Sequence, residues 1–198
     1  MYRKSVNDVA INPELSAEQI NEVNSFLKEY SDIFTDVPKI THLAKHRVDL
    51  TQKEPVRSKI YPIPYKMEEV ISNEIDDMLA KGIIERSEAA YASPLVLVKK
   101  PDGTYRTCMN FKELNKITVF DPEPIMSADD IFPKLALSHY YGTFDFCKGY
   151  WQIPMEENSK DCTTFVSSSG LFRFKVVPFG LVNAGSTCNC MVRKFWNR

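Results

Sequence analysis

The sequence predicts an α+β fold, and three observations lead to that prediction. Apolar residues recur at helical spacing in residues 16–30 and again in residues 65–81. Residues 93–110 form two strand-like runs around a Pro-Asp-Gly turn, which is typical of a β-hairpin. Further strand-like runs follow between residues 140 and 177, before a last helical stretch at 184–196. Helices and antiparallel strands in separate runs are typical of an α+β domain.

Composition bounds the class of protein. A chain of 198 residues suits one large domain or two small ones, and its 43% hydrophobic content is ordinary for a soluble protein. The formal net charge of −1 means that any nucleic-acid site must be a local patch. Five cysteines without paired spacing predict reduced thiols in an intracellular protein, in the cytoplasm or, as an open alternative, the nucleus. No apolar run approaches 18 residues, so we expect no membrane insertion.

Each predicted helix has a start signal or an apolar stripe. Ser16 and Gln19 form a capping box, and the stripe that follows is expected to pack on the core. The helix at 65–81 has its own stripe, and Gly82 suits the position just after its end. Ser127 is expected to cap a helix over residues 128–137.

Residues 35–64 are expected to be extended because four prolines interrupt them. His42 and His46 lie four apart, with Asp49 three further on, which on a helix is a zinc-binding spacing. The β-like residues 46–50 argue against a helix, so a metal site is not expected there.

The predicted hairpin carries several cations at its tip. Alternation places Arg106, Cys108 and Asn110 on one face, while Lys99 and Lys100 lie at the turn. Such a tip either grips phosphate groups or is an ordinary solvated turn, and the pattern alone leaves both open.

Asp145 lies between Phe144 and Phe146 in a run that reads as a buried strand starting at Tyr140. A carboxylate taken out of water normally has a cation, a metal or several donors as a partner. The alternative is that Asp145 caps a helical turn that starts at Cys147. Downstream, Gly149 marks a place of close backbone approach.

Two more strands are predicted before the last helix, at residues 162–167 and 171–177. In the second, Phe172, Phe174 and Val176 share one face.

Four segments together resemble one family, the reverse transcriptases of gypsy-like long-terminal-repeat retrotransposons. The resemblance covers residues 44–196, and its motifs occur in order at 93–106, 110–115, 143–153 and 177–184. It implies the α+β fold of polymerase fingers and a partial palm, in which helices back a ferredoxin-like palm sheet. The implied division is a linker and helix at 1–43, fingers at 44–124 and the first part of the palm at 125–198.

The resemblance also implies roles for single residues. Asp145, with the backbone carbonyl of Phe146, would bind the two Mg²⁺ ions of a two-metal nucleotidyltransferase. Lys100 and Arg106 match the cations that hold the incoming triphosphate, and Lys99 is the alternative to Lys100. The remaining implied nucleotide-binding residues are Tyr150, whose ring would crowd a ribose 2′-hydroxyl, and Phe179 and Gly180 in the pocket loop.

By the same resemblance the activity is RNA-directed DNA polymerisation, with an RNA or DNA template, a primer and deoxynucleoside triphosphates as partners; the oligomeric state is left open. Cys188 and Cys190 depart from the family pattern in the last helix. No Tyr-x-Asp-Asp motif occurs up to Arg198, so we expect this chain alone to be inactive. The alternatives are a catalytically inactive or co-opted fragment that binds nucleic acid or protein, and a non-enzymatic α+β domain.

Overall fold

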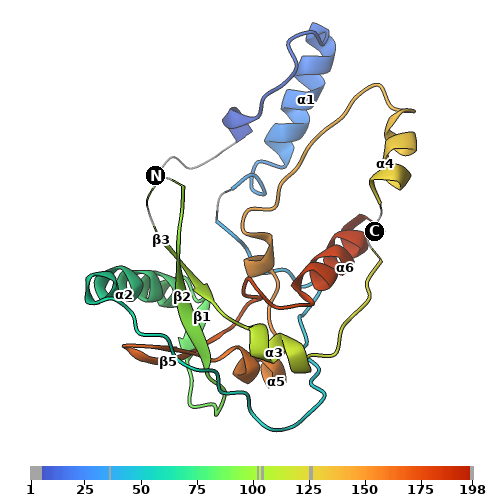
Figure 1. The fold of residues 1–198 in the computed structure, drawn as a ribbon. Coiled ribbons are helices and arrows are strands. Elements are labelled where there is room, and N and C mark those ends of the chain that lie inside the picture. The colour runs from blue at the N-terminus through green and yellow to red at the C-terminus, as the bar shows by residue number, and fades with distance from the viewer. Residues whose placement is uncertain (1–5, 36, 102, 104, 125–126, 197–198) are drawn as a thin grey trace.

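The fold is built on a five-stranded sheet with helices around it (Figure 1). The computed structural model describes residues 6–35, 37–101, 103, 105–124 and 127–196. The strands are β1 (Ile84–Arg86), β2 (Ser93–Lys99), β3 (Tyr105–Met109), β4 (Phe165–Ser167) and β5 (Gly170–Phe174). The α-helices are α1 (Ala17–Glu29), α2 (Tyr65–Ala80), α3 (Lys112–Ile117), α4 (Ala128–Leu135), α5 (Glu157–Lys160) and α6 (Ala184–Trp196). The short 3₁₀ helices are η1 (Val6–Asp8), η2 (Gly149–Gln152) and η3 (Asp161–Thr163).

The strand order in the sheet is β1-β5-β4-β2-β3. Strands β2 and β4 run parallel, and the other neighbouring pairs are antiparallel. Strands on both sides of residue 124 therefore share one sheet. The fingers–palm boundary predicted at that point stays a prediction.

The hairpin and the helix before it are confirmed. Strands β2 and β3 pair from Leu95↔Met109 to Lys99↔Tyr105, and Gly103 adopts a φ of +83° in the turn. Helix α2 ends at Ala80 with Lys81 as its C-cap, and Gly82 follows with a φ of +67°, as predicted for the position just after the helix. The amide of Gly82 donates to the Leu79 carbonyl and that of Ile83 to Met78, which is the Schellman arrangement.

The helix caps are confirmed, but one apolar stripe is not buried. The Gln19 amide donates to Ser16 Oγ, and Ser127 caps α4 in the same way. In α1, however, Phe26 and Tyr30 are 53% and 41% exposed, so the expectation that this stripe packs on the core is wrong for these two residues, while Leu27 is buried. Figure 1 shows the reason, since α1 and α4 both lie away from the sheet.

The core lies between α2, the sheet and α6. Its fully buried apolar members come from two parts of the chain, residues 71–114 and 153–177: Ile71, Ile75, Ile84, Phe111, Leu114, Ile153, Phe165, Phe172, Val176 and Val177. The predicted shared face of Phe172, Phe174 and Val176 is confirmed, because all three are buried while Arg173 and Lys175 between them are not. The strand expected at 162–167 begins only at Phe165, because the preceding residues form η3.

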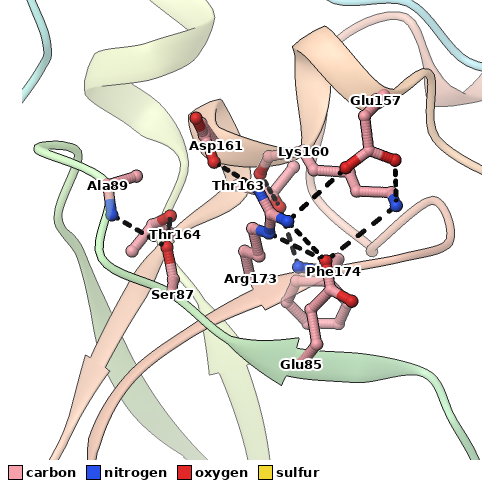
Figure 2. Close-up of polar contacts among 10 residues, drawn as sticks. All are labelled: Glu85, Ser87, Ala89, Glu157, Lys160, Asp161, Thr163, Thr164, Arg173 and Phe174. Atoms are coloured by element: carbon pink, nitrogen blue, oxygen red, sulfur yellow. Dashed lines mark hydrogen bonds and ion pairs between the residues drawn. The ribbon is translucent and has the colours of Figure 1, made fainter.

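On the face of β5 opposite to Phe172 and Phe174, Arg173 lies in a cluster of ion pairs (Figure 2). The Arg173 guanidinium donates to Glu85 Oε1 at 2.8 Å and to Asp161 Oδ1 at 2.6 Å. Lys160 pairs with Glu157 beside it. The Arg173 side chain is only 24% exposed, so these contacts are partly shielded from solvent and tie β1, β5 and η3 together.

Two other findings concern the chain as a whole. Residues 44, 46 and 48 are buried and alternate with exposed neighbours, which confirms the β-like character of that stretch. Among the described helices, none has the length and apolar character needed to cross a membrane.

Candidate functional site

The β2–β3 hairpin separates the predicted cations by face. Val98 lies opposite Arg106, and Lys99 lies opposite Tyr105. Residues directly opposite in an antiparallel pair share a face, and successive residues alternate. Arg106 therefore lies on the face opposite to that of Lys99. Lys100 follows the last paired residue and belongs by alternation to the face of Arg106. The register thus favours Lys100 over Lys99 as the partner of Arg106.

An aromatic cluster lies beside this hairpin. The rings of Tyr150 and Phe179 are 5.2 Å apart, and those of Trp151 and Phe179 are 6.4 Å apart. Phe179 is 58% exposed, although it is at the centre of the cluster. Phe179 thus presents an exposed ring that packs against two other rings.

A cavity of about 350 Å³ brings the two sets together. It lies between α2, β3, η2 and the end of β5, and its lining includes Met78, Arg106, Trp151, Phe174 and Phe179. The structure thus brings Arg106 and Phe179 to one site, with Tyr150 next to Phe179. We call this cavity the Trp151 cavity.

Two glycines near this site have a structural reason. A Cβ on Gly149 would lie 3.2 Å from Phe146 Cβ, tighter than most such contacts, so the chain approaches closely there as predicted. Gly180 has a φ of +99°, a conformation that residues with a side chain rarely adopt.

Asp145 does not lie in a strand. Residues 140–146 form no regular element, and Phe144 and Phe146 are 65% and 44% exposed. Asp145 is itself exposed, so the prediction of a carboxylate in a buried strand is wrong. The alternative cap is also wrong, because η2 begins at Gly149 and its N-cap residue is Lys148. The sheet of the described residues offers this segment no paired neighbour, and a single strand without one is not stable in water.

Lys148 is a feature of the site that the sequence reasoning missed. It has a φ of +47°, which makes it the one non-glycine residue with positive φ among those described, and its Nζ lies 4.5 Å from the centre of the Trp151 ring. The strained backbone turns the chain between Asp145 and Tyr150. A lysine in this position carries no sequence signal for that conformation, because only glycine, asparagine and aspartate favour it.

His46 is not a metal ligand in this arrangement. Its ring is buried, and its Nδ1 lies 2.7 Å from Thr187 Oγ1 in α6. Burial lowers the pKa of His46 to about 4, although the nearby Asp121 carboxylate raises it. Within the described ranges there is no group of three or more His, Cys, Asp or Glu side chains that could hold a metal ion.

The two unusual cysteines do not disturb the last helix. Helix α6 runs from Ala184 to Trp196, as predicted. Cys188 is half-buried and packs against the core, and this burial raises the pKa of its thiol. Cys190 lines a second cavity of about 390 Å³, which also contains Asp121 and Lys194.

Comparisons with known proteins agree on one family. Residues 98–198 match the family described as reverse transcriptase (RNA-dependent DNA polymerase). The chain is 34% identical over 181 residues to the retrovirus-related Pol polyprotein from transposon 297 of Drosophila melanogaster. That match covers 87% of this chain and 17% of the polyprotein.

Solved structures show the same fold. The protease-reverse transcriptase of prototype foamy virus (CSH mutant) has a TM-score of 0.78 and 21% identity, covering 93% of this chain and 25% of that chain. A foamy viral protease-reverse transcriptase in complex with an RNA/DNA hybrid has a TM-score of 0.73 and 17% identity, covering 97% and 26%. The present chain thus spans about a quarter of these proteins, and the likeness confirms its predicted fold.

Proposed function

The chain belongs to the reverse transcriptase family, and from that premise we propose that it forms the fingers and first part of the palm of an RNA-directed DNA polymerase. The observation that carries the proposal is the meeting of Arg106, Phe179 and Tyr150 at one site. A guanidinium for phosphate oxygens beside aromatic rings for a sugar or base is what binding a nucleoside triphosphate requires.

In this proposal each residue has a separate task. Arg106 and Lys100 donate charge-assisted hydrogen bonds to the triphosphate from one face of the hairpin. Phe179 and Gly180 line the nucleotide pocket, and the positive φ of Gly180 sets the course of that loop. Tyr150 lies under the sugar, where its ring excludes a 2′-hydroxyl. The template and primer are an RNA or DNA strand pair, as in the foamy viral complex with an RNA/DNA hybrid.

The metal site fits the described residues only in part. Asp145 is an exposed carboxylate, and Mg²⁺ is commonly held by one or two carboxylates together with substrate phosphates. Two ions need more protein ligands than one carboxylate and the Phe146 carbonyl, and the described residues contain no such group. We therefore assign Asp145 as the metal ligand of the proposed active site and derive no step through the ions.

The first test is binding of a fluorescently labelled deoxynucleoside triphosphate to the 198-residue chain, measured by fluorescence anisotropy at 50 mM and 200 mM salt. Each lost phosphate contact should weaken binding, and more so at low salt, because salt screens charge-assisted contacts. Arg106→Ala and Lys100→Ala should both show this. Lys99→Ala should have a smaller effect, because Lys99 lies on the other face. Lys28→Ala in α1 is the matched control with the same charge change. Unchanged affinity in the Arg106 variant would overturn the assignment.

The second test is primer extension on an RNA template with magnesium. The 198-residue chain should be inactive, and a chain extended at its carboxyl end by a Tyr-x-Asp-Asp hairpin should be active. Asp145→Asn should abolish the activity of the extended chain, because it removes the proposed metal ligand with little change in shape. Activity that survives this substitution would exclude Asp145 from the metal site.

A further inference from the structure

The side chain of Asn115 in α3 bonds to the loop that carries Phe179. Its Nδ2 donates to the backbone carbonyl oxygen of Gly180 at 2.8 Å, and its Oδ1 accepts from the backbone N–H of Val182 at 3.0 Å. These partners lie 65 and 67 residues away in the sequence. One side-chain amide therefore pairs with two backbone groups of residues 179–183, which we call the Phe179 loop.

Side-chain packing holds this loop at its middle. Leu181 is 7% exposed and belongs to the core, whereas Phe179 and Val182 on either side of it are 58% and 39% exposed. Burial of Leu181 therefore fixes one point of the loop and leaves the direction of the backbone around it open. The two bonds to Asn115 lie on either side of that point, so together they set this direction.

Asn115 is itself held in place by its helix. Leu114 beside it and Phe111 before the first turn of α3 are each 2% exposed, so the core anchors this short helix. The loop also lies close to the same part of the chain. A Cβ on Gly180 would lie 3.6 Å from the carbonyl oxygen of Met109 and 3.6 Å from the Phe111 ring.

The position of the loop decides where the Phe179 ring lies. Phe179 directly precedes Gly180, and its ring is 5.2 Å from that of Tyr150 and 6.4 Å from that of Trp151. Gly180 has a φ of +99°, which is one of several conformations open to a glycine. The bond from Asn115 to the Gly180 carbonyl favours one of them, and this keeps the exposed Phe179 ring in its cluster.

We propose that Asn115 is a positioning residue of the nucleotide site, whose two hydrogen bonds hold the Phe179 loop in the conformation that binds a nucleoside triphosphate. This proposal rests on the function proposed above, and Asn115 acts through the loop without touching the nucleotide. A loop without these bonds occupies other conformations as well. The apparent affinity for the nucleotide then falls in proportion to the fraction of molecules that keep the binding conformation.

The first test measures the loop without a nucleotide. Amide hydrogen exchange of Val182 is followed by NMR in the ¹⁵N-labelled 198-residue chain. Asn115→Leu has a similar shape but neither polar group, so exchange of the Val182 amide should be at least about fivefold faster, the factor of one typical hydrogen bond. Asn115→Asp keeps an acceptor oxygen for this amide, so exchange should stay slow. The pair of variants separates loss of the bond from a change of side-chain shape.

The second test measures nucleotide affinity by the anisotropy assay described above. Asn115→Leu should weaken binding of the labelled deoxynucleoside triphosphate about fivefold for each lost bond, up to about 25-fold. Asn24→Leu, at an exposed position in α1, is the control with the same chemical change and should bind normally. Asn115→Asp is not compared here, because its negative charge would itself repel a triphosphate.

Urea unfolding of each variant separates positioning from stability. A merely structural role of Asn115 would lower the unfolding midpoint and leave the affinity of the folded chain unchanged. If Asn115→Leu does not fold, Asn115→Ser takes its place in both tests, because its neutral side chain is too short to bridge the two backbone groups.

Two outcomes would overturn the proposal while the proposed function stands. One is equal exchange of the Val182 amide in the Asn115→Leu variant and the unsubstituted chain. The other is equal nucleotide affinity in these two proteins, provided that Arg106→Ala weakens binding. If the unsubstituted chain binds no nucleotide, the proposed function fails and this proposal fails with it, so the two failures are distinguishable.

Discussion

His46 should make the stability of this protein fall as the pH falls below neutrality. Its ring is 1% exposed and is neutral at pH 7, since burial lowers its pKa from 6.5 to about 4. In the unfolded chain the same ring takes up a proton below pH 6.5. The unfolded state therefore binds more protons than the folded state between pH 6.5 and 4, and stability is lost as the pH drops through that window.

The size of the loss follows from the two pKa values. The loss is negligible above pH 7.5, about 2 kcal/mol at pH 5 and at most about 3.4 kcal/mol below pH 4. A domain of this size is typically stable by roughly 5–15 kcal/mol, so the change is large enough to shift the unfolding midpoint clearly. The loss is localised to the junction that His46 makes, where its backbone bonds to Pro154 and Glu156 and its ring bonds to Thr187.

The assay is urea unfolding of the 198-residue chain and of His46→Asn at pH 7.5 and pH 5.0. Asparagine keeps an amide nitrogen near the position of Nδ1 but does not titrate. The rest of the chain is identical in the two proteins, so its contribution cancels in the comparison. The unsubstituted chain should lose about 2 kcal/mol more than the variant between the two pH values. Equal losses in both proteins would refute the reasoning, because they would show that His46 is not protonated differently on unfolding.

Three further predictions concern other parts of the molecule. Arg173→Met should destabilise the fold by about 1–3 kcal/mol in urea unfolding, because it leaves Glu85 and Asp161 without their shared donor; a change within error would show that solvent already screens the cluster. Gly180→Ala should cost roughly 1–2 kcal/mol in the same assay, since its φ of +99° is strained for alanine, and an equally stable variant would contradict this. In an extended, active chain, Tyr150→Val should admit ribonucleotides more readily while Tyr150→Phe should not, and an unchanged ratio of deoxy- to ribonucleotide incorporation in the valine variant would show that the ring does not select the sugar.

The parts of the fold that were predicted correctly are those fixed by neighbours in sequence. These parts are the hairpin at 93–110, the Ser16 and Ser127 caps, and the glycine that follows α2. Each depends on a few adjacent residues whose preference for a turn or a cap is known from their type. The first and last residues of helix α6, Ala184 and Trp196, were also predicted correctly. Its apolar spacing remained readable despite the two unusual cysteines.

The contacts that could not be predicted join residues far apart in the chain. His46 and Thr187 are 141 residues apart, and Arg173 bonds to Glu85 across 88 residues. Composition and periodicity carry no information about which polar side chains will meet across such distances. The same holds for the Trp151 cavity, because Thr107 and Trp151 look in the sequence like ordinary members of a strand and a turn.

The segment around Asp145 has residues that favour β-structure but forms no strand. Its aromatic residues favour β-structure, but a strand is stable only when a neighbour completes its hydrogen bonds and covers its apolar side chains. In the described residues this segment contacts the N-terminal region instead: Gln19 Nε2 donates to the Tyr140 hydroxyl at 2.9 Å, and the Phe34 and Phe144 rings are 6.4 Å apart. If Asp145 has the proposed metal-binding role, Phe144 and Phe146 must become covered when the site is complete, because two exposed phenylalanines cannot hold a carboxylate in a fixed position. The proposed chemistry at Asp145 therefore requires a partner strand as well as a metal ion.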